Sequence, residues 1–221
     1  VFVAVGGHHL QIGRPQLAGM VCFVLLFSML VSRRWRRANW VGVAALFAVW
    51  ANVHGSFIVG LATIGCFCIG RAGNPVVRSR DFTAPVRDKK TLRLSLLLLL
   101  AAVAVVVNPY GLQIYRAVAS ISSNDNLAAL VEWGPLTIRM RQGRVFAATA
   151  LLMMMLYRLS PRRASLTEVL LLFSLGGATL WTSRMIVWFA PIAAFYLALH
   201  ASAVWKARTP RRRVGQSSSS S

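Results

Sequence analysis

Acidic residues are scarce in this chain of 221 residues, which has five Asp and Glu against 25 Lys and Arg. Charged residues of both signs make up only 14% of the chain, whereas a soluble domain has about a quarter. Hydrophobic residues make up 57% and are gathered into long runs, such as residues 94–107 and 185–205. Runs of this length are too continuous for one face of a soluble helix, so the composition argues against a soluble globular domain.

Cysteine is also scarce, and the three that occur, Cys22, Cys66 and Cys68, all lie within apolar runs. We expect them to be small buried hydrophobic residues. The sequence has no CxxC pair and no Cys/His spacing typical of a metal site, so we expect no metal and no cofactor. It also lacks a GxSxG elbow, an HExxH motif and a glycine-rich phosphate loop followed by Lys. These absences argue against a serine hydrolase, a zinc protease, a kinase or an ATPase.

The formal net charge of +20 raises the question of nucleic-acid binding. A nucleic-acid-binding protein gathers its positive charge on one folded face. Here the charge lies in short clusters between the apolar runs, at residues 33–37, 71–93, 158–163 and 206–213. Such clusters are typical of the cytoplasmic loops of membrane proteins, where Lys and Arg are enriched. We therefore predict an integral membrane protein whose partner is the lipid bilayer and which binds no nucleic acid.

The apolar runs predict an all-α bundle of about six to seven transmembrane spans, because a span needs about 20 apolar residues, or as few as about 17. Residues 40–70 are too long for one span, since a single helix would measure about 46 Å against a core of roughly 30 Å. We predict two short spans that turn at residues 52–56, where Gly55 supplies backbone freedom, or alternatively a re-entrant hairpin. The predicted spans are residues 16–32, 40–53, 57–70, 92–107, 145–159, 166–181 and 185–205.

The basic clusters predict the orientation of these spans, because the positive-inside rule places such clusters in the cytoplasm. The predicted pairing of spans puts 19 Lys and Arg on the inner side and six on the outer side. We therefore expect a multi-pass protein of the cell membrane, with residues 1–205 as its transmembrane domain. Residues 206–221 form a basic and then Ser-rich tail, which we expect to be cytoplasmic and disordered.

The predicted topology brings residues 6–16, 52–56, 108–143 and 182–184 to the outer side. Their polar residues are candidates for a site, and they include Arg14, Asn52, His54, Asn108, Tyr110, Glu132 and Arg184. Ionisable groups near membrane depth are costly and often functional. Structural alternatives stay open, because Asn52 and His54 would equally satisfy backbone groups freed at the turn. Glu132 would equally be a solvated loop acid, and Arg184 a snorkelling anchor.

Asn108 and Pro109 predict the end of a span, because the residue before Pro avoids helical geometry and Pro lacks an N–H donor. Apolar residues then recur with helical spacing at Leu112, Ile114, Tyr115, Val118 and Ile121. We predict a short amphipathic helix in the membrane interface, either as an anchor or as part of a substrate site. On the inner side, Glu168 lies near the start of a span, where we expect it to act as a helix cap.

Several short motifs together resemble a known group of proteins. They are Arg14-Pro15-Gln16, Trp50-Ala51-Asn52-Val53-His54-Gly55, Asn108-Pro109-Tyr110-Gly111, Glu132-Trp133 with Pro135 after it, and Arg184 before Trp188-Phe189-Ala190-Pro191. Over roughly residues 12–195, the chain resembles the C-terminal half of a group of bacterial multi-pass membrane proteins. That group is similar to the GT-C glycosyltransferases, the superfamily that uses polyprenyl-phosphate-linked sugars.

The resemblance implies a membrane glycosyltransferase that takes its sugar from a polyprenyl-phosphate-linked donor. Its catalytic acid is expected in an outer loop near the N-terminus of the whole protein, so no residue here is assigned as catalytic. Arg14, His54 and Arg184 become candidates to bind the donor phosphate, since cations stabilise a phosphate leaving group. We expect coding sequence upstream of Val1, because residues 1–7 read as the end of a cut apolar helix.

Two other functions stay open on the sequence alone. A transporter or flippase would place broken helices near the membrane midplane, and Gly176-Gly177 is the candidate for such a break. No matching break occurs elsewhere, and no acidic residue lies at the centre of a predicted span. A non-catalytic membrane scaffold subunit is the third alternative, and no feature of the sequence excludes it.

Overall fold

The computed structural model of the protein describes residues 15–32, 34–79, 88–122 and 133–209, and all regular structure in these residues is helical. The prediction of an all-α protein is therefore confirmed for this part of the chain. In chain order, the elements are α2 (Pro15–Val31), α3 (Ala38–Val53), α4 (Phe57–Ser79), α6 (Lys89–Val105), α7 (Gln113–Ser122), α8 (Arg141–Leu159), α9 (Leu166–Trp181), the 3-10 turn η3 (Ser183–Met185) and α10 (Ile186–Arg208).

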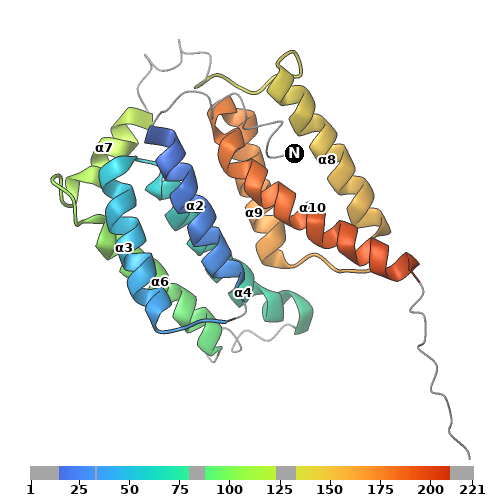
Figure 1. Cartoon of the computed structure of the whole chain (residues 1–221), viewed down its shortest axis with the longest axis horizontal. Helices are drawn as coiled ribbons and strands as arrows, with labels where there is room; N and C mark the ends of the chain where they lie inside the picture. The colour runs from blue at the N-terminus through green and yellow to red at the C-terminus, as the bar shows by residue number, and fades with distance from the viewer. Residues whose placement is uncertain (1–14, 33, 80–87, 123–132, 210–221) are drawn as a thin grey trace, which may run out of the picture.

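The long helices run up and down along one common direction and form a bundle (Figure 1). Helix α6 packs on α3 and α4, α4 packs on α9, and α9 packs on α10. Helix α8 packs on α10, and α2 packs on α3, α4 and α10. The α3–α4 turn, the α9–α10 turn and α7 all lie at one end of the bundle, the upper end in Figure 1. We call the opposite end the lower end.

Basic side chains are concentrated at the lower end of the bundle. Twelve of those that the structure describes lie there: Arg34, Arg36, Arg37, Arg71, Lys89, Lys90, Arg93, Arg158, Arg162, Arg163, Lys206 and Arg208. Five lie at the upper end: Arg116, Arg139, Arg141, Arg144 and Arg184. The clusters that the sequence predicts on one side of a membrane therefore share one end of the fold.

In the part of the chain that the structure describes, two helices are long and apolar enough to cross a membrane, over residues Phe57–Pro75 and Ser183–Arg208. The apolar helices Gln16–Val31, Ala38–Val53 and Leu166–Trp181 are shorter. Among the described helices, two therefore combine the length and the apolar character of a span, fewer than the six to seven predicted. The reason is local, since turns at residues 54–56 and 182 end α3 and α9 after 16 residues each. A helix of 16 residues measures about 24 Å, which is less than a bilayer core of roughly 30 Å.

Residues 40–70 form two helices that meet at a tight turn, as predicted. The turn arises at His54, whose extended backbone (φ −159°, ψ 136°) ends α3 while its N–H still donates to the Trp50 carbonyl. The role predicted for Gly55 is wrong, because among the described residues the glycine with positive φ is Gly111 (φ 51°). The absence of a side chain at Gly55 instead lets α7 pack closely on the turn, since a Cβ there would lie 3.2 Å from a methyl group of Val118 on α7.

Helix α7 forms where the amphipathic pattern predicts a helix, and the middle of its apolar stripe packs on the bundle. Ile114 is buried, and the Tyr115 ring meets the Phe57 ring edge-on at 5.9 Å. The Tyr115 hydroxyl donates a hydrogen bond to the Ala102 carbonyl at 2.7 Å. The two ends of the stripe, Leu112 and Ile121, are exposed. This helix therefore forms a wall at the upper end of the bundle.

The bundle is apolar on its outside as well as in its core. Phe23, Phe47 and Trp50 are fully buried at the centre. On the outer face of α6, a stripe of Leu92, Leu96, Leu99 and Val103 is between 48% and 62% exposed. Other large apolar side chains that point outward include Val21, Leu25, Leu151, Met154, Phe173, Trp181 and Trp205.

The lower end is held by capping interactions. Asp88 caps α6 by accepting from the N–H groups of Lys90 and Thr91, and it pairs with Arg71 of α4 at 2.7 Å. These contacts hold the pKa of the Asp88 carboxyl well below its usual range, with the bond from Arg71 as the largest cause. Helix α10 continues to Arg208, so residues 206–208 are helical although we expected them in the tail. Residues 210–221 of that tail lie outside the described part of the chain.

Candidate functional site

The structure brings two of the predicted site residues together in one cavity. His54, from the α3–α4 turn, and Arg184, from η3, both line a cavity of about 410 Å³ at the upper end of the bundle. Asn52, Asn108 and Tyr110 line a neighbouring cavity of about 380 Å³. Arg14 and Glu132 lie outside the described residues, as do His8, His9, Gln11 and Asp125. The sequence-based assignment of a phosphate site to these residues stays a prediction.

The cavity of His54 and Arg184 has mainly apolar walls. Ile58 and Val59 come from the start of α4, Val118 and Ile121 from α7, and Trp188 from α10. Trp188 is nearly buried and packs on Phe23 and Trp50, with ring centres at 5.4 Å and 6.4 Å. The aromatic core therefore continues directly into the cavity wall.

Hydrogen bonds hold the His54 ring in one neutral form. The Ser56 backbone N–H donates to His54 Nδ1 at 3.0 Å, so Nδ1 is an acceptor and carries no proton. The Ser56 hydroxyl lies 2.7 Å from the same nitrogen, and it accepts from Trp50 Nε1 at 3.0 Å. The hydroxyl proton therefore also points to Nδ1. The ring proton is consequently on Nε2, which leaves His54 with one N–H donor outside this network.

Burial lowers the pKa of His54 from its ordinary value of 6.5, and the positive charge of Arg184 lowers it further. Both causes favour the neutral ring. Near neutral pH the described lining of the cavity therefore carries one full positive charge, on Arg184, beside a neutral N–H donor on His54.

Arg184 is held in place by a contact with the ring of Trp133. Its guanidinium carbon lies 5.0 Å from the centre of the Trp133 ring, which is a cation–π contact. The loop that carries Trp133 is attached to the end of α9 by two backbone hydrogen bonds, from Ser183 N to Gly134 O and from Leu136 N to Leu180 O. The arginine is thus positioned at the cavity wall by a stacked aromatic ring.

This arrangement suits an anion attached to an apolar group. An arginine fork and an imidazole N–H both bind phosphate or carboxylate oxygens. None of the described residues that line this cavity is acidic. The remaining walls are aliphatic and aromatic, and a volume of several hundred Å³ is typical of a small-molecule site.

In the second cavity, the polar side chains bind mainly to the backbone of the protein itself. Asn52 donates from its amide to the carbonyls of Ala48 and Val107, at 2.8 Å and 2.7 Å, and so joins α3 to the end of α6. Asn108 donates to the Val105 carbonyl at 2.6 Å and accepts from the Tyr110 N–H. Both amides satisfy backbone groups at helix ends, and for Asn52 this is the structural alternative that the sequence leaves open. Tyr110 is exposed at the rim.

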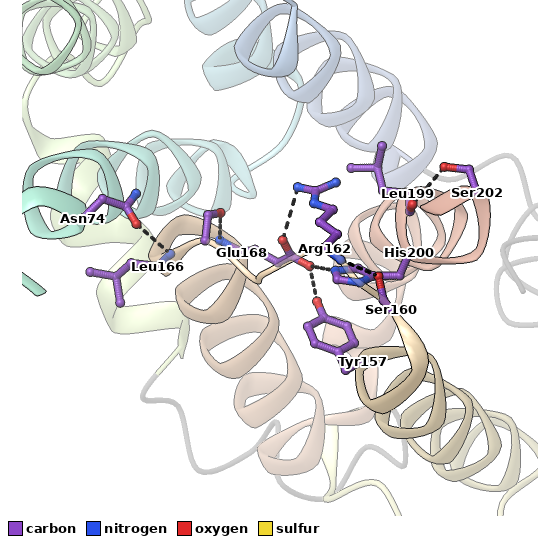
Figure 2. A network of polar contacts seen from close by, with 10 residues as sticks. Asn74, Tyr157, Ser160, Arg162, Leu166, Glu168, Leu199, His200 and Ser202 are labelled. Atoms are coloured by element: carbon purple, nitrogen blue, oxygen red, sulfur yellow. Dashed lines mark hydrogen bonds and ion pairs between the residues drawn. The ribbon is translucent and has the colours of Figure 1, made fainter. Parts of the chain in front are cut away.

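A second group of ionisable residues lies at the lower end, and the sequence analysis missed it (Figure 2). The Glu168 carboxylate is fully buried and accepts from the Tyr157 hydroxyl. His200 Nε2 lies 2.8 Å from the same carboxylate oxygen, and an Arg162 nitrogen lies 3.5 Å from the other oxygen. Helices α8, α9 and α10 and the loop between α8 and α9 all contribute to this cluster.

The predicted capping role of Glu168 is wrong for its side chain. Ser165 caps α9 by accepting from the Glu168 N–H, and Asn74 accepts from the Leu166 N–H. The Glu168 carboxylate turns instead toward α8 and α10. The spacing Ser165-x-x-Glu168 predicts a helix cap. The other sign of this cluster in the sequence is His200, a polar residue within an apolar run. Residues 32 positions apart in the chain cannot be paired from spacing alone.

The helix break that a transporter would need is not seen at Gly176-Gly177, because α9 is continuous from Leu166 to Trp181. Gly176 is buried and faces Phe189 of α10, so it serves helix packing.

Comparison with protein-family models, with curated proteins and with solved structures finds no match to this chain.

Proposed function

We propose that this chain is the donor-binding part of a GT-C-type membrane glycosyltransferase, and that it binds the phosphate of a polyprenyl-phosphate-linked sugar between His54 and Arg184. The observation that carries the proposal is the shared cavity of these two residues, which are 130 positions apart in the chain. The sequence resemblance proposes the same two residues for the same ligand. No catalytic residue is assigned among the described residues.

The exposed apolar side chains of the bundle support the proposal that it lies in a membrane. Soluble monomers rarely expose large contiguous apolar patches, yet α6 carries an exposed aliphatic stripe along its whole length. Exposed Trp181 and Trp205 lie near opposite ends of the bundle, as expected for residues at the two interfaces. Lipid would solvate both features. The helices that are shorter than a full span then require local thinning of the bilayer or burial of their ends in protein.

The charge distribution supports one orientation. The lower end, with most of the described Lys and Arg, faces the cytoplasm in this proposal, and so does the C-terminus. The cavity of His54 and Arg184 then opens on the outer side of the cell membrane.

The chemistry of the cavity supports a lipid-linked phosphate over a soluble anion. A soluble anion would gain little from the aliphatic side chains of Ile58, Val59 and Val118. An isoprenoid chain would bury apolar area against them, at about 25 cal/mol per Å². The phosphate would meet Arg184, and the Nε2–H of His54 would complete the anion contact.

The test is a binding titration on the full chain in nanodiscs, using a short-chain polyprenyl phosphate and the matching polyprenol. Trp133 and Trp188 line the cavity, so intrinsic fluorescence reports binding. We expect Arg184→Gln to weaken phosphate-lipid binding roughly 10- to 100-fold, which is the range for a lost charged hydrogen bond. Arg139→Gln removes an equal charge from an exposed position at the same end and should bind like wild type. Equal affinity for the alcohol, or for the Arg184 variant, would contradict the proposal.

A further inference from the structure

Trp35 and Arg93 form a contact at the lower end of the bundle, away from the cavity of His54 and Arg184. The guanidinium carbon of Arg93, in the first turns of α6, lies 4.8 Å from the centre of the Trp35 ring. Trp40, at the start of α3, meets the Trp35 ring edge-on at 6.0 Å. The arginine is therefore held against an aromatic wall, and its position is set by two elements of the fold.

Both members of this contact have a buried N–H group without an acceptor. Trp35 Nε1 and Arg93 Nε are inaccessible to solvent, and neither has a hydrogen-bond partner in the described chain. Buried N–H donors are nearly always paired in folded proteins. Two unpaired donors at one contact therefore favour an acceptor that the described residues do not supply.

The charge around the contact indicates that this acceptor is anionic. Arg34, Arg36 and Arg37 lie beside Trp35 in the chain, and Lys89 and Lys90 lie one turn before Arg93, all with exposed side chains. The nearest described acid, Asp88, is already bound to Arg71 and to the first N–H groups of α6. The described residues therefore offer no free carboxylate to these donors.

Apolar side chains next to the contact indicate an anion that carries acyl chains. Leu92 and Leu96 flank Arg93 on α6, and both are exposed at the start of the aliphatic stripe on that helix. Tryptophan and arginine at the end of such a stripe are typical of the headgroup level of a bilayer. A turn of the Arg93 side chain away from the Trp35 ring would open both donors to the phosphate, while the leucines meet the acyl chains.

We propose that Trp35 and Arg93 form a binding site for the phosphate of an anionic phospholipid in the cytoplasmic leaflet. This proposal rests on the membrane orientation given under the proposed function, but not on the donor-binding cavity. The neighbouring Lys and Arg disfavour a headgroup that also carries a positive charge. Phosphatidylglycerol should therefore bind more tightly than phosphatidylcholine.

The test is native mass spectrometry of the full chain in an uncharged detergent, titrated with phosphatidylglycerol or phosphatidylcholine. We expect Trp35→Phe and Arg93→Gln each to weaken phosphatidylglycerol binding roughly tenfold. Trp35→Phe keeps an aromatic ring against Trp40 and removes the N–H donor together with part of the ring area, so an unchanged melting temperature without lipid shows that it folds. Lys90→Gln, the control, removes an equal charge from the same helix and should change affinity less than about twofold.

The remaining outcomes separate the sources of failure. If Trp35→Phe and Arg93→Gln bind phosphatidylglycerol like wild type, the lipid site is wrong. If inorganic phosphate displaces the lipid at equal concentration, the site binds free phosphate and the lipid assignment is also wrong. If the chain is soluble without detergent, the membrane orientation itself fails. Arg184→Gln should leave phosphatidylglycerol binding unchanged, so a failure at the outer cavity would not be mistaken for a failure here.

Discussion

At the scale of single residues, His54 is kept neutral by burial first and by Arg184 second. Removing the arginine charge should therefore raise the pKa of His54, but leave it below the ordinary 6.5 because burial remains. We expect this result for Arg184→Gln in an NMR pH titration of the His54 ring, assigned by the loss of its signal in His54→Asn. Arg144→Gln, an exposed charge at the same end, should leave the pKa unchanged. A pKa of 6.5 or above in Arg184→Gln would show that charge, not burial, controls the ring.

The lowered pKa of His54 also has a consequence for stability. Below pH 6.5 the unfolded chain takes up a proton at this residue before the folded chain does. Stability should therefore be lost as the pH falls from 6.5 toward the pKa of the folded state, and no further below it. His54→Asn should remove this part of the pH dependence.

Among the described residues, the buried Glu168 carboxylate has three partners, which are Arg162, His200 and Tyr157. Arg162→Gln should lower the free energy of unfolding by about 1–2 kcal/mol, less than for a fully buried pair because Arg162 is partly exposed. Arg163→Gln removes the neighbouring exposed charge and should have little effect. Denaturant unfolding in detergent micelles measures both, and equal effects would mean that Arg162 acts only as a surface charge.

The sequence predicted some residues of the candidate site and missed others for identifiable reasons. Topology places His54 and Arg184 at the same end, because turns at the same side of a bundle must lie near one another. Their meeting in one cavity depends on the loop of Trp133 and on α7, whose positions no spacing predicts. The Glu168 and His200 pair depends on the packing of α9 on α10, which is equally invisible in the sequence.

At the scale of helices, Gly70 allows a close approach between α4 and α9. A Cβ at Gly70 would overlap the backbone of Thr167, whereas a Cβ at Gly65 of the same helix would meet nothing. Gly70→Ala should therefore destabilise the bundle by about 1–3 kcal/mol through overpacking. Gly65→Ala should be neutral or stabilising by up to about 1 kcal/mol, because Ala favours helix. The opposite order of the two variants in thermal unfolding would exclude this packing.

Helix positions were predicted well where apolar runs end in strong signals. The helix predicted over residues 166–181 has those bounds in the structure, and the pair at 40–70 divides at the predicted turn. Helix α4 is longer than predicted and continues through Pro75 to Ser79. Hydropathy falls after Gly70, but the helix persists because Arg71 pairs with Asp88 and Asn74 caps α9. Polar contacts between segments extend a helix where the apolar pattern has already ended.

At the scale of the whole molecule, both proposed sites depend on the bundle lying across a membrane. In the described part of the chain, an exposed aliphatic surface, two helices long and apolar enough to span, and basic residues at one end all support that arrangement. The outer cavity for a lipid-linked phosphate and the inner site for a phospholipid both require it. They also require opposite sides, since His54 and Trp35 lie at opposite ends of α3.

Cysteine accessibility in intact cells tests this arrangement most directly. In a chain with Cys22, Cys66 and Cys68 replaced by Ala, single cysteines are introduced as Tyr110→Cys, Lys90→Cys and Phe173→Cys, all exposed positions. We predict that a polar thiol reagent labels the Tyr110 position from outside and the Lys90 position only after permeabilisation. The Phe173 position, 77% exposed in the middle of α9, should be labelled from neither side because lipid covers it. Labelling of the Tyr110 and Lys90 positions from the same side, or ready labelling at Phe173, would contradict the account.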